Sequence, residues 1–195
     1  TFGPRLIHLG HDEPRVINRD GRCRARGLKA HELYVDDIVR MHGYVKEADP
    51  KCRLMIWSDA FRVNEKGEVK VAWYSEEKCT LEDAVRSVPR DIILCPWRYT
   101  ETEVGLLYRD METLAAAGFE VTGSPWYDLP NAVAWGQASR RLRQESDRFL
   151  GLFLTTWDDR WEALPLTGDL MWRLAGADVA GEGQALRRAL EERYA

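Results

Sequence analysis

Short apolar runs alternate with longer amphipathic stretches along this chain. Five runs have the length and composition of buried strands, and they cover residues 6–9, 53–57, 91–95, 119–122 and 149–155. The other stretches predict helices at 28–48, 81–87, 102–117, from Pro130 onward, near Leu170 and at 184–194. Residues 61–79 are polar and irregular, which predicts a long loop or a small hairpin. This alternation predicts parallel strands joined by right-handed crossovers.

The strand ends distinguish two architectures that share this alternation. A doubly wound sheet gathers its ligand at one switch point, typically beside a glycine-rich phosphate loop, and the sequence has no G-x-G-x-x-G or P-loop motif. In an eightfold barrel each strand contributes residues at its carboxyl end. Here aromatic or acidic residues follow all five runs. We therefore expect an α/β fold of the (β/α)8 TIM-barrel type.

Five strands are too few to close such a barrel, which usually takes about 250 residues. We expect residues 1–195 to form a single domain, the C-terminal portion of a TIM-barrel catalytic domain, with approximately strands four to eight and their helices. Such a portion leaves two strand edges and an apolar inner face open. The missing barrel half, or a second copy of the chain, is expected to cover them.

The composition narrows the class of partner. The chain has 195 residues, of which 45% are hydrophobic and 31% charged, as in soluble globular domains. Its formal net charge of −4 gives no electrostatic reason to bind nucleic acid or an anionic membrane. The four cysteines lie far apart without the close pairs of a zinc site, so we expect free thiols, which slightly favours a cytoplasmic location.

The clearest chemical signal is an adjacent pair of acids, Asp12 and Glu13, just beyond the first apolar run. Gly10 and Pro14 flank the pair and allow a loop that turns both carboxyl groups toward one cleft. A metal site formed by His8, His11 and Asp12 is an alternative. Because the two histidines are three residues apart on a segment expected to be extended, they would point to opposite faces, and we expect no metal.

The run from His8 to Glu13 resembles the His-x-Gly-x-Asp-Glu pattern that ends the fourth barrel strand of the family 20 glycoside hydrolases, the β-N-acetylhexosaminidases. That family lines an acetamide pocket with tryptophans after strand five, in the following loop and after strand eight. Trp57, Trp73 and Trp157 occupy matching places. The resemblance therefore extends over most of the chain.

Two further patterns of the family have counterparts here. A tyrosine and an acid two residues apart after strand six correspond to Tyr99 and Glu101, and a Trp-x-acid pattern after strand eight ends at Asp159. Both acids differ in length from the family's usual aspartate and glutamate, and His11 stands where a glycine is common. The sugar selectivity can therefore differ from that of the family.

The resemblance implies a retaining glycoside hydrolase that removes terminal N-acetylhexosamine through an oxazolinium intermediate formed by the substrate's own acetamide group. Glu13 would be the general acid and base, Asp12 would hold the acetamide N–H, and Tyr99 would bind the acetamide oxygen. The implied substrate-binding residues are His8, Trp57, Asp59, Trp73, Glu101, Trp126, Trp157 and Asp159. No cofactor is implied, and the partner is an N-acetylhexosamine-containing glycan.

Three function classes follow. The first is this hydrolase, with the present portion expected to be inactive alone because an arginine that the family takes from its first strand has no counterpart. The second is a non-catalytic carbohydrate-binding or degenerate barrel protein, because a fold alone does not establish turnover. The third is a metal-dependent hydrolase using the two histidines and Asp12.

Overall fold

The structure is a computed structural model that describes residues 3–159, 161 and 164. It divides into two compact units. The first unit comprises Thr1–Cys95 and Ala117–Glu120, and the second comprises Pro96–Ala116 and Val121–Ala195. Both units combine parallel strands with helices, and each is described separately.

The first unit is built on three parallel strands, β1 (Leu6–His8), β2 (Arg53–Trp57) and β3 (Ile93–Cys95). Leu6 lies opposite Arg53, and Met55 lies opposite Ile93. Four of the five β2 residues and all of β3 are buried. Such continuous apolar strands are typical of parallel sheets that are covered on both faces.

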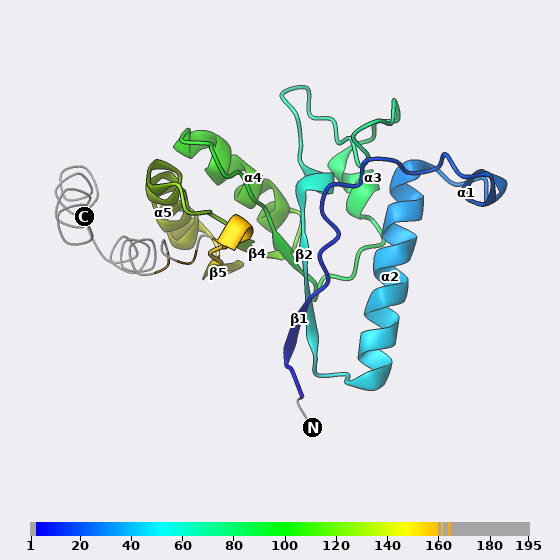
Figure 1. Cartoon of the computed structure of the whole chain (residues 1–195), viewed down its shortest axis with the longest axis horizontal. Coiled ribbons are helices and arrows are strands. Elements are labelled where there is room, and N and C mark those ends of the chain that lie inside the picture. Colours follow the sequence, from blue (N-terminus) through cyan, green and yellow to red (C-terminus); the bar gives the residue numbers. More distant parts are fainter. Residues whose placement is uncertain (1–2, 160, 162–163, 165–195) are drawn as a thin grey trace, which may run out of the picture. The chain divides into compact units, whose positions relative to one another are not determined.

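The first unit also contains the longest described helix, α2 (Ala30–Ala48), whose buried face includes Leu33, Tyr34 and Ile38. The Glu32 carboxylate accepts a hydrogen bond from the main-chain N–H of Lys29 and so caps its start. The helix ends at Ala48, with Asp49 as its capping residue, and the chain then turns back through Pro50 into β2 (Figure 1).

Two short helices complete the first unit. Helix α3 (Leu81–Val85) begins after Thr80, whose side chain accepts a hydrogen bond from the main chain of Asp83. Helix α1 (Gly21–Ala25) was not anticipated, because five residues are too short to show a helical periodicity. The polar segment 61–79 includes the expected small hairpin, with antiparallel bridges of Val69 to Val63 and to Cys79.

The second unit contains α4 (Val104–Ala116), α5 (Leu129–Glu145), the strand β4 (Glu120–Gly123) apart from its first residue, and the strand β5 (Phe149–Leu152), which is parallel to β4. Trp97, two residues beyond β3, forms a parallel bridge with Ser124, the residue after β4. A β-carbon added at Gly123 would lie 2.6 Å from the Trp135 ring and 2.8 Å from Leu152. Only glycine fits at this position of the core.

The strands follow one another in sequence order, β1-β2-β3-β4-β5, and all are parallel. The predicted α/β class and parallel strands are therefore confirmed. Strand β5 is shorter than the predicted run and ends at Leu152. The helices expected near Leu170 and at 184–194 lie outside the described residues. None of the described helices combines the length and hydropathy that a membrane span requires.

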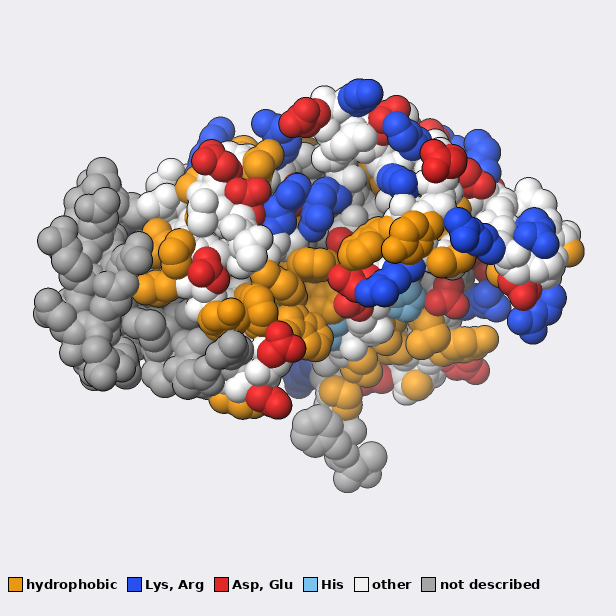
Figure 2. All heavy atoms as spheres, turned by 45° about the horizontal axis from the view of Figure 1, so that its top comes forward, with side chains coloured by type: hydrophobic (Ala, Val, Ile, Leu, Met, Phe, Trp, Pro, Cys, Tyr) orange, Lys and Arg blue, Asp and Glu red, His pale blue; other side chains and the backbone are white. Residues whose placement is uncertain are grey.

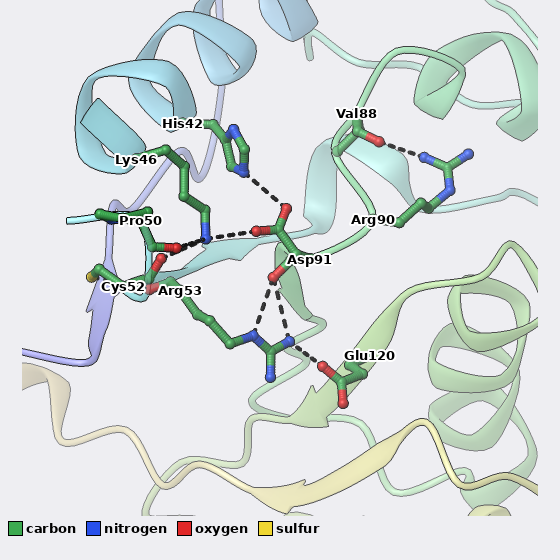
Figure 3. A network of polar contacts seen from close by, with 9 residues as sticks. All are labelled: His42, Lys46, Pro50, Cys52, Arg53, Val88, Arg90, Asp91 and Glu120. Atoms are coloured by element: carbon green, nitrogen blue, oxygen red, sulfur yellow. Dashed lines mark hydrogen bonds and ion pairs between the residues drawn. The ribbon is translucent and has the colours of Figure 1, made fainter. Parts of the chain in front are cut away.

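An ion cluster lies at the amino ends of the strands in the first unit (Figure 3). The Asp91 carboxylate accepts hydrogen bonds from Lys46 Nζ and His42 Nε2, both at 2.8 Å. Arg53 donates to the main-chain oxygen of Asp91 and pairs with Glu120. Burial alone would raise the pKa of the Asp91 carboxyl. The hydrogen bonds from Lys46 and His42 have the opposite and larger combined effect, so the pKa lies below the ordinary value. The cluster thus fastens α2 to the start of the sheet.

Candidate active site

The loop that follows β1 has an unusual backbone. Gly10, His11 and Glu13 all adopt positive φ angles, of 79°, 67° and 47°. For residues with a β-carbon this left-handed region is unfavourable, at a cost of roughly 1–3 kcal/mol each, and such strain is concentrated at functional sites. The segment is therefore not extended beyond His8, and the expectation that His8 and His11 lie on one extended strand is wrong.

Hydrogen bonds from two other segments hold this loop. The Tyr34 hydroxyl on α2 donates to the main-chain oxygen of His11 at 2.6 Å. After β2, the Asp59 carboxylate accepts the main-chain N–H of Glu13 at 2.9 Å. The N–H of Trp57 donates to the oxygen of Gly10 at 2.9 Å. The acidic pair is thus positioned by residues far away in the sequence.

Tyr34 is nearly completely buried and packs edge-on against Phe61. Burial, together with the nearby carboxylates of Asp59 and Asp12, raises its pKa well above the ordinary value. The phenol therefore remains protonated and remains a hydrogen-bond donor to the loop over the whole physiological range of pH.

The imidazole ring of His8 is uncharged and lies close to Asp12. Its ring lies 4.3 Å from that of the buried Trp57, centroid to centroid. Burial lowers its pKa from 6.5 to about 4, against the opposing influence of Asp12. The N–H of Gly10 donates to Nδ1 at 3.0 Å, so Nδ1 acts as the acceptor and the neutral ring has its proton on Nε2.

The two acids are accessible to solvent. Asp12 is exposed, and the Glu13 side chain is 36% exposed, with its Oε2 3.3 Å from an Arg15 nitrogen. The Arg15 guanidinium in turn lies 5.8 Å from the Trp73 ring, and the N–H of Trp73 donates to the oxygen of Pro14. The first unit therefore brings six predicted residues into one neighbourhood: His8, Asp12, Glu13, Trp57, Asp59 and Trp73.

The second unit gathers aromatic side chains around Tyr99. The Trp97 ring stacks on the Tyr99 ring with centroids 4.8 Å apart. The Trp126 ring centroid lies 5.4 Å from that of Tyr99. Trp157 Nε1 donates to the Tyr99 hydroxyl at 2.5 Å, and Trp126 Nε1 donates to the Trp157 main-chain oxygen. An indole nitrogen only donates, so the Tyr99 oxygen accepts and its own proton points away from Trp157.

The other two predicted acids of the second unit have local partners. Glu101 Oε1 accepts the main-chain N–H groups of Thr102 and Glu103 at 2.9 and 2.8 Å, just before α4. Asp159 is exposed, and its Oδ1 accepts Trp161 Nε1 at 3.4 Å. One oxygen of Glu101 is therefore engaged with the backbone.

Sequence reasoning missed Tyr34, Arg15 and Trp97 as parts of these two groups. Tyr34 lies four residues before Ile38, and both are buried, so helical spacing could have shown that it points inward. Trp97 follows a predicted strand, which marks it as a candidate. Nothing in the sequence connects Arg15 with Trp73, because their contact depends on the course of two loops.

No group of three His, Cys, Asp or Glu side chains in the described part of the chain could hold a metal ion. The cysteines at 23, 52, 79 and 95 are free thiols, as expected, and Cys52 and Cys95 belong to the core. The chain matches no protein-family model and no curated protein sequence. The likeness to family 20 therefore rests on the residue pattern alone.

Proposed function

We propose that this chain carries the acid/base residues of a retaining β-N-acetylhexosaminidase, within the C-terminal portion of a TIM barrel. The observation that supports the proposal most is the strained loop of the first unit. There the side chains of the adjacent Asp12 and Glu13 are accessible to solvent, and the main-chain N–H of Glu13 donates a hydrogen bond to Asp59. The parallel strands in sequence order agree with the barrel.

Glu13 would protonate the glycosidic oxygen and then activate water. A general acid must be held in a fixed direction and yet reach the substrate. The bond to Asp59 fixes the backbone of Glu13, while the carboxylate remains partly exposed. Asp59 would therefore act as a positioning residue in this mechanism.

Asp12 would accept the acetamide N–H and stabilise the positive charge of the oxazolinium. Its neighbour His8 is neutral near pH 7, because burial lowers the pKa of the imidazole to about 4. A protonated His8 would compete with the substrate for the negative charge of Asp12. The neutral ring leaves that charge available to the developing cation.

Tyr99 would donate its hydroxyl proton to the acetamide oxygen. The Trp157 indole N–H holds the Tyr99 oxygen from one side, which restricts the direction of that proton. Substrate assistance needs the acetamide oxygen aligned with the anomeric carbon, so a fixed donor would favour the reactive conformer.

The test is turnover of an aryl β-N-acetylhexosaminide by the intact protein. Glu13→Gln should abolish turnover, while Glu103→Gln, an exposed control, should leave it unchanged. Asp12→Asn should weaken inhibition by oxazoline-type compounds at least tenfold. Near-normal turnover by the Glu13 variant would remove this residue from the mechanism. Saturable binding of N-acetylglucosamine by an intact protein that never hydrolyses it would favour a purely carbohydrate-binding protein.

A further inference from the structure

A cavity of about 540 Å³ lies in the first unit, between the amino-terminal half of α2 and the segment around α3. Small-molecule binding sites commonly measure roughly 300–1,000 Å³. On α2 the cavity is lined by His31, Val35 and Val39, which are spaced four residues apart and so lie on one face of the helix. Cys79 and Asp83 line it from the other segment. None of these residues belongs to the acid loop.

Part of the cavity wall is apolar. Val35 is buried, and Val39 is 38% exposed. The Cys79 thiol belongs to this part, because burial, together with the Asp83 carboxylate, raises its pKa above the ordinary value and keeps it protonated. A protonated thiol is neither a good nucleophile nor a metal ligand. This part of the wall is therefore suited to the hydrocarbon portion of a ligand.

Three carboxylates also line the cavity, and each of them already has a partner. Those of Asp36 and Asp83 pair with arginines at the surface. The Glu32 carboxylate accepts the main-chain N–H of Lys29 at 2.7 Å. The wall therefore offers no carboxylate that is waiting for a cationic ligand.

The His31 ring, in contrast, has unused hydrogen-bonding capacity. The residue is only 9% exposed, lines the cavity, and makes no hydrogen bond to any residue that the structure describes. A buried polar group without a hydrogen bond is costly, so such a group in a cavity wall is a good indication of a bound polar ligand.

Lys29 differs in the same way from the other cations of the wall. Lys78 pairs with Glu68, and the guanidinium of Arg86 is paired as well, whereas the Lys29 ammonium has no carboxylate partner in the described part of the chain. Charge alone marks no site, because Figure 2 shows acidic and basic side chains intermixed along the upper edge of the view. The cavity is distinguished by two unused donors beside an apolar wall.

We propose that this cavity binds a small organic carboxylate. The ligand's carboxylate accepts hydrogen bonds from the Lys29 ammonium and from the His31 ring, and its hydrocarbon part packs against Val35 and Val39. Hydrogen bonds between ionised groups are the strong ones in such sites. The cavity lies at the amino end of the 19-residue helix α2, where the helix dipole favours a negative charge.

The experiment titrates the intact protein with three probes, hexanoate, its neutral amide hexanamide and inorganic phosphate. NMR follows the ring signals of His31 and the main-chain amide of Val39. Hexanoate should shift both signals in a saturable manner. Hexanamide should bind about tenfold more weakly because it lacks the charge. Phosphate should also bind about tenfold more weakly, because it has no hydrocarbon part to bury.

Variants locate the carboxylate. Lys29→Gln should weaken hexanoate binding about two- to fivefold, the range of an exposed ion pair. Val39→Glu places a negative charge in the cavity and should weaken it by about tenfold or more. Both residues are exposed, so the fold should tolerate the changes. Lys66→Gln and Tyr44→Glu are the matched controls, exposed and outside the cavity wall, and should leave binding unchanged.

Several outcomes would overturn the carboxylate site: no binding of hexanoate, equal binding of hexanoate and hexanamide, or binding of phosphate alone. Hexanoate binding that leaves the His31 signals unshifted, or that persists in Val39→Glu, would do the same. The site shares no residue with the proposed hydrolase mechanism. Glu13→Gln should therefore bind hexanoate like the parent chain, whatever its effect on turnover.

Discussion

The acid loop of the first unit and the aromatic group of the second are held in place by different forces. Main-chain hydrogen bonds from Tyr34 and to Asp59 hold the acids on a backbone that is locally unfavourable. Ring stacking and indole N–H bonds hold Tyr99. The acid loop thus depends on a few directional contacts, while Tyr99 depends on packing. Substitutions should therefore affect the two groups in different ways.

The largest effect should come from disturbing the packing of the second unit. Gly123→Ala places a β-carbon against the buried Trp135 ring and Leu152, and overpacking should destabilise the protein by about 3 kcal/mol. Chemical denaturation measures this change. Gly43→Ala, at an open and exposed position inside α2, is the control and should stabilise by roughly 0.5–1 kcal/mol. Equal effects of the two variants would refute the packing argument.

A pH effect should come from His8. Its folded pKa of about 4 lies below the ordinary 6.5, so the unfolded chain binds more protons between these values. The stability contributed by the neutral ring is therefore complete above about pH 6.5 and lost as the pH falls toward 4, by about 2 kcal/mol at pH 4.5. Urea unfolding at pH 7 and 4.5 measures the loss.

His8→Gln should remove most of that loss, because an amide does not titrate in this range. The pKa of Asp91 is lowered from 3.8, so its contribution disappears only at more acidic pH and leaves the His8 window clear. An unchanged pH dependence in His8→Gln would show that other groups are responsible.

Tyr34→Phe should separate the contribution of the Tyr34 hydrogen bond to the acid loop from the contribution of its ring packing. The variant keeps the ring packed against Phe61 but removes the hydrogen bond to the His11 carbonyl. We expect a loss of about 1.5 kcal/mol in unfolding free energy. The loop should also become looser, which amide hydrogen exchange at residues 10–13 would report as faster exchange. Protection equal to that of the parent chain would contradict a role of Tyr34 in the loop.

The smallest effect concerns the backbone strain at His11. His11→Ala and His11→Gly both remove the ring contact with Tyr34 and the hydrogen bond with Asp37, but only glycine adopts the left-handed backbone easily. The glycine variant should be more stable than the alanine variant by about 1 kcal/mol. Thermal unfolding of the pair gives this difference, and equal stabilities would indicate that the loop relaxes elsewhere.

The sequence predicted the regular elements well where the signal was local. The bounds of β2 agree with the apolar run 53–57, and α2 begins two residues later than the predicted 28–48 because Glu32 caps the helix at Lys29. Strand β5 is shorter than its run, and Gly151 near its end has a φ of 143°. A run of apolar residues shows where a strand can form but not where its pairing stops.

The candidate site was predictable as a set of residues but not as a geometry. The acidic pair, Trp126 and Trp157 are visible in the sequence because they follow strand-like runs, and Trp57 because it ends one, whereas Trp73 lies in the polar segment 61–79. The left-handed backbone at His11 and Glu13 is not, because neither residue type suggests it. It depends on Tyr34 and Asp59, which are 23 and 46 residues away from the groups that they bind.

The Asp91 cluster has a consequence for remodelling this protein. It joins α2 to the beginnings of the strands, at the end of the sheet opposite to the acid loop. The exposed side chains of the loops at 9–15 and 61–79 can therefore be varied in a library while this anchoring of α2 is preserved. The buried residues of the second loop, Phe61, Val69, Val71 and Ala72, have to be kept, because they belong to the core.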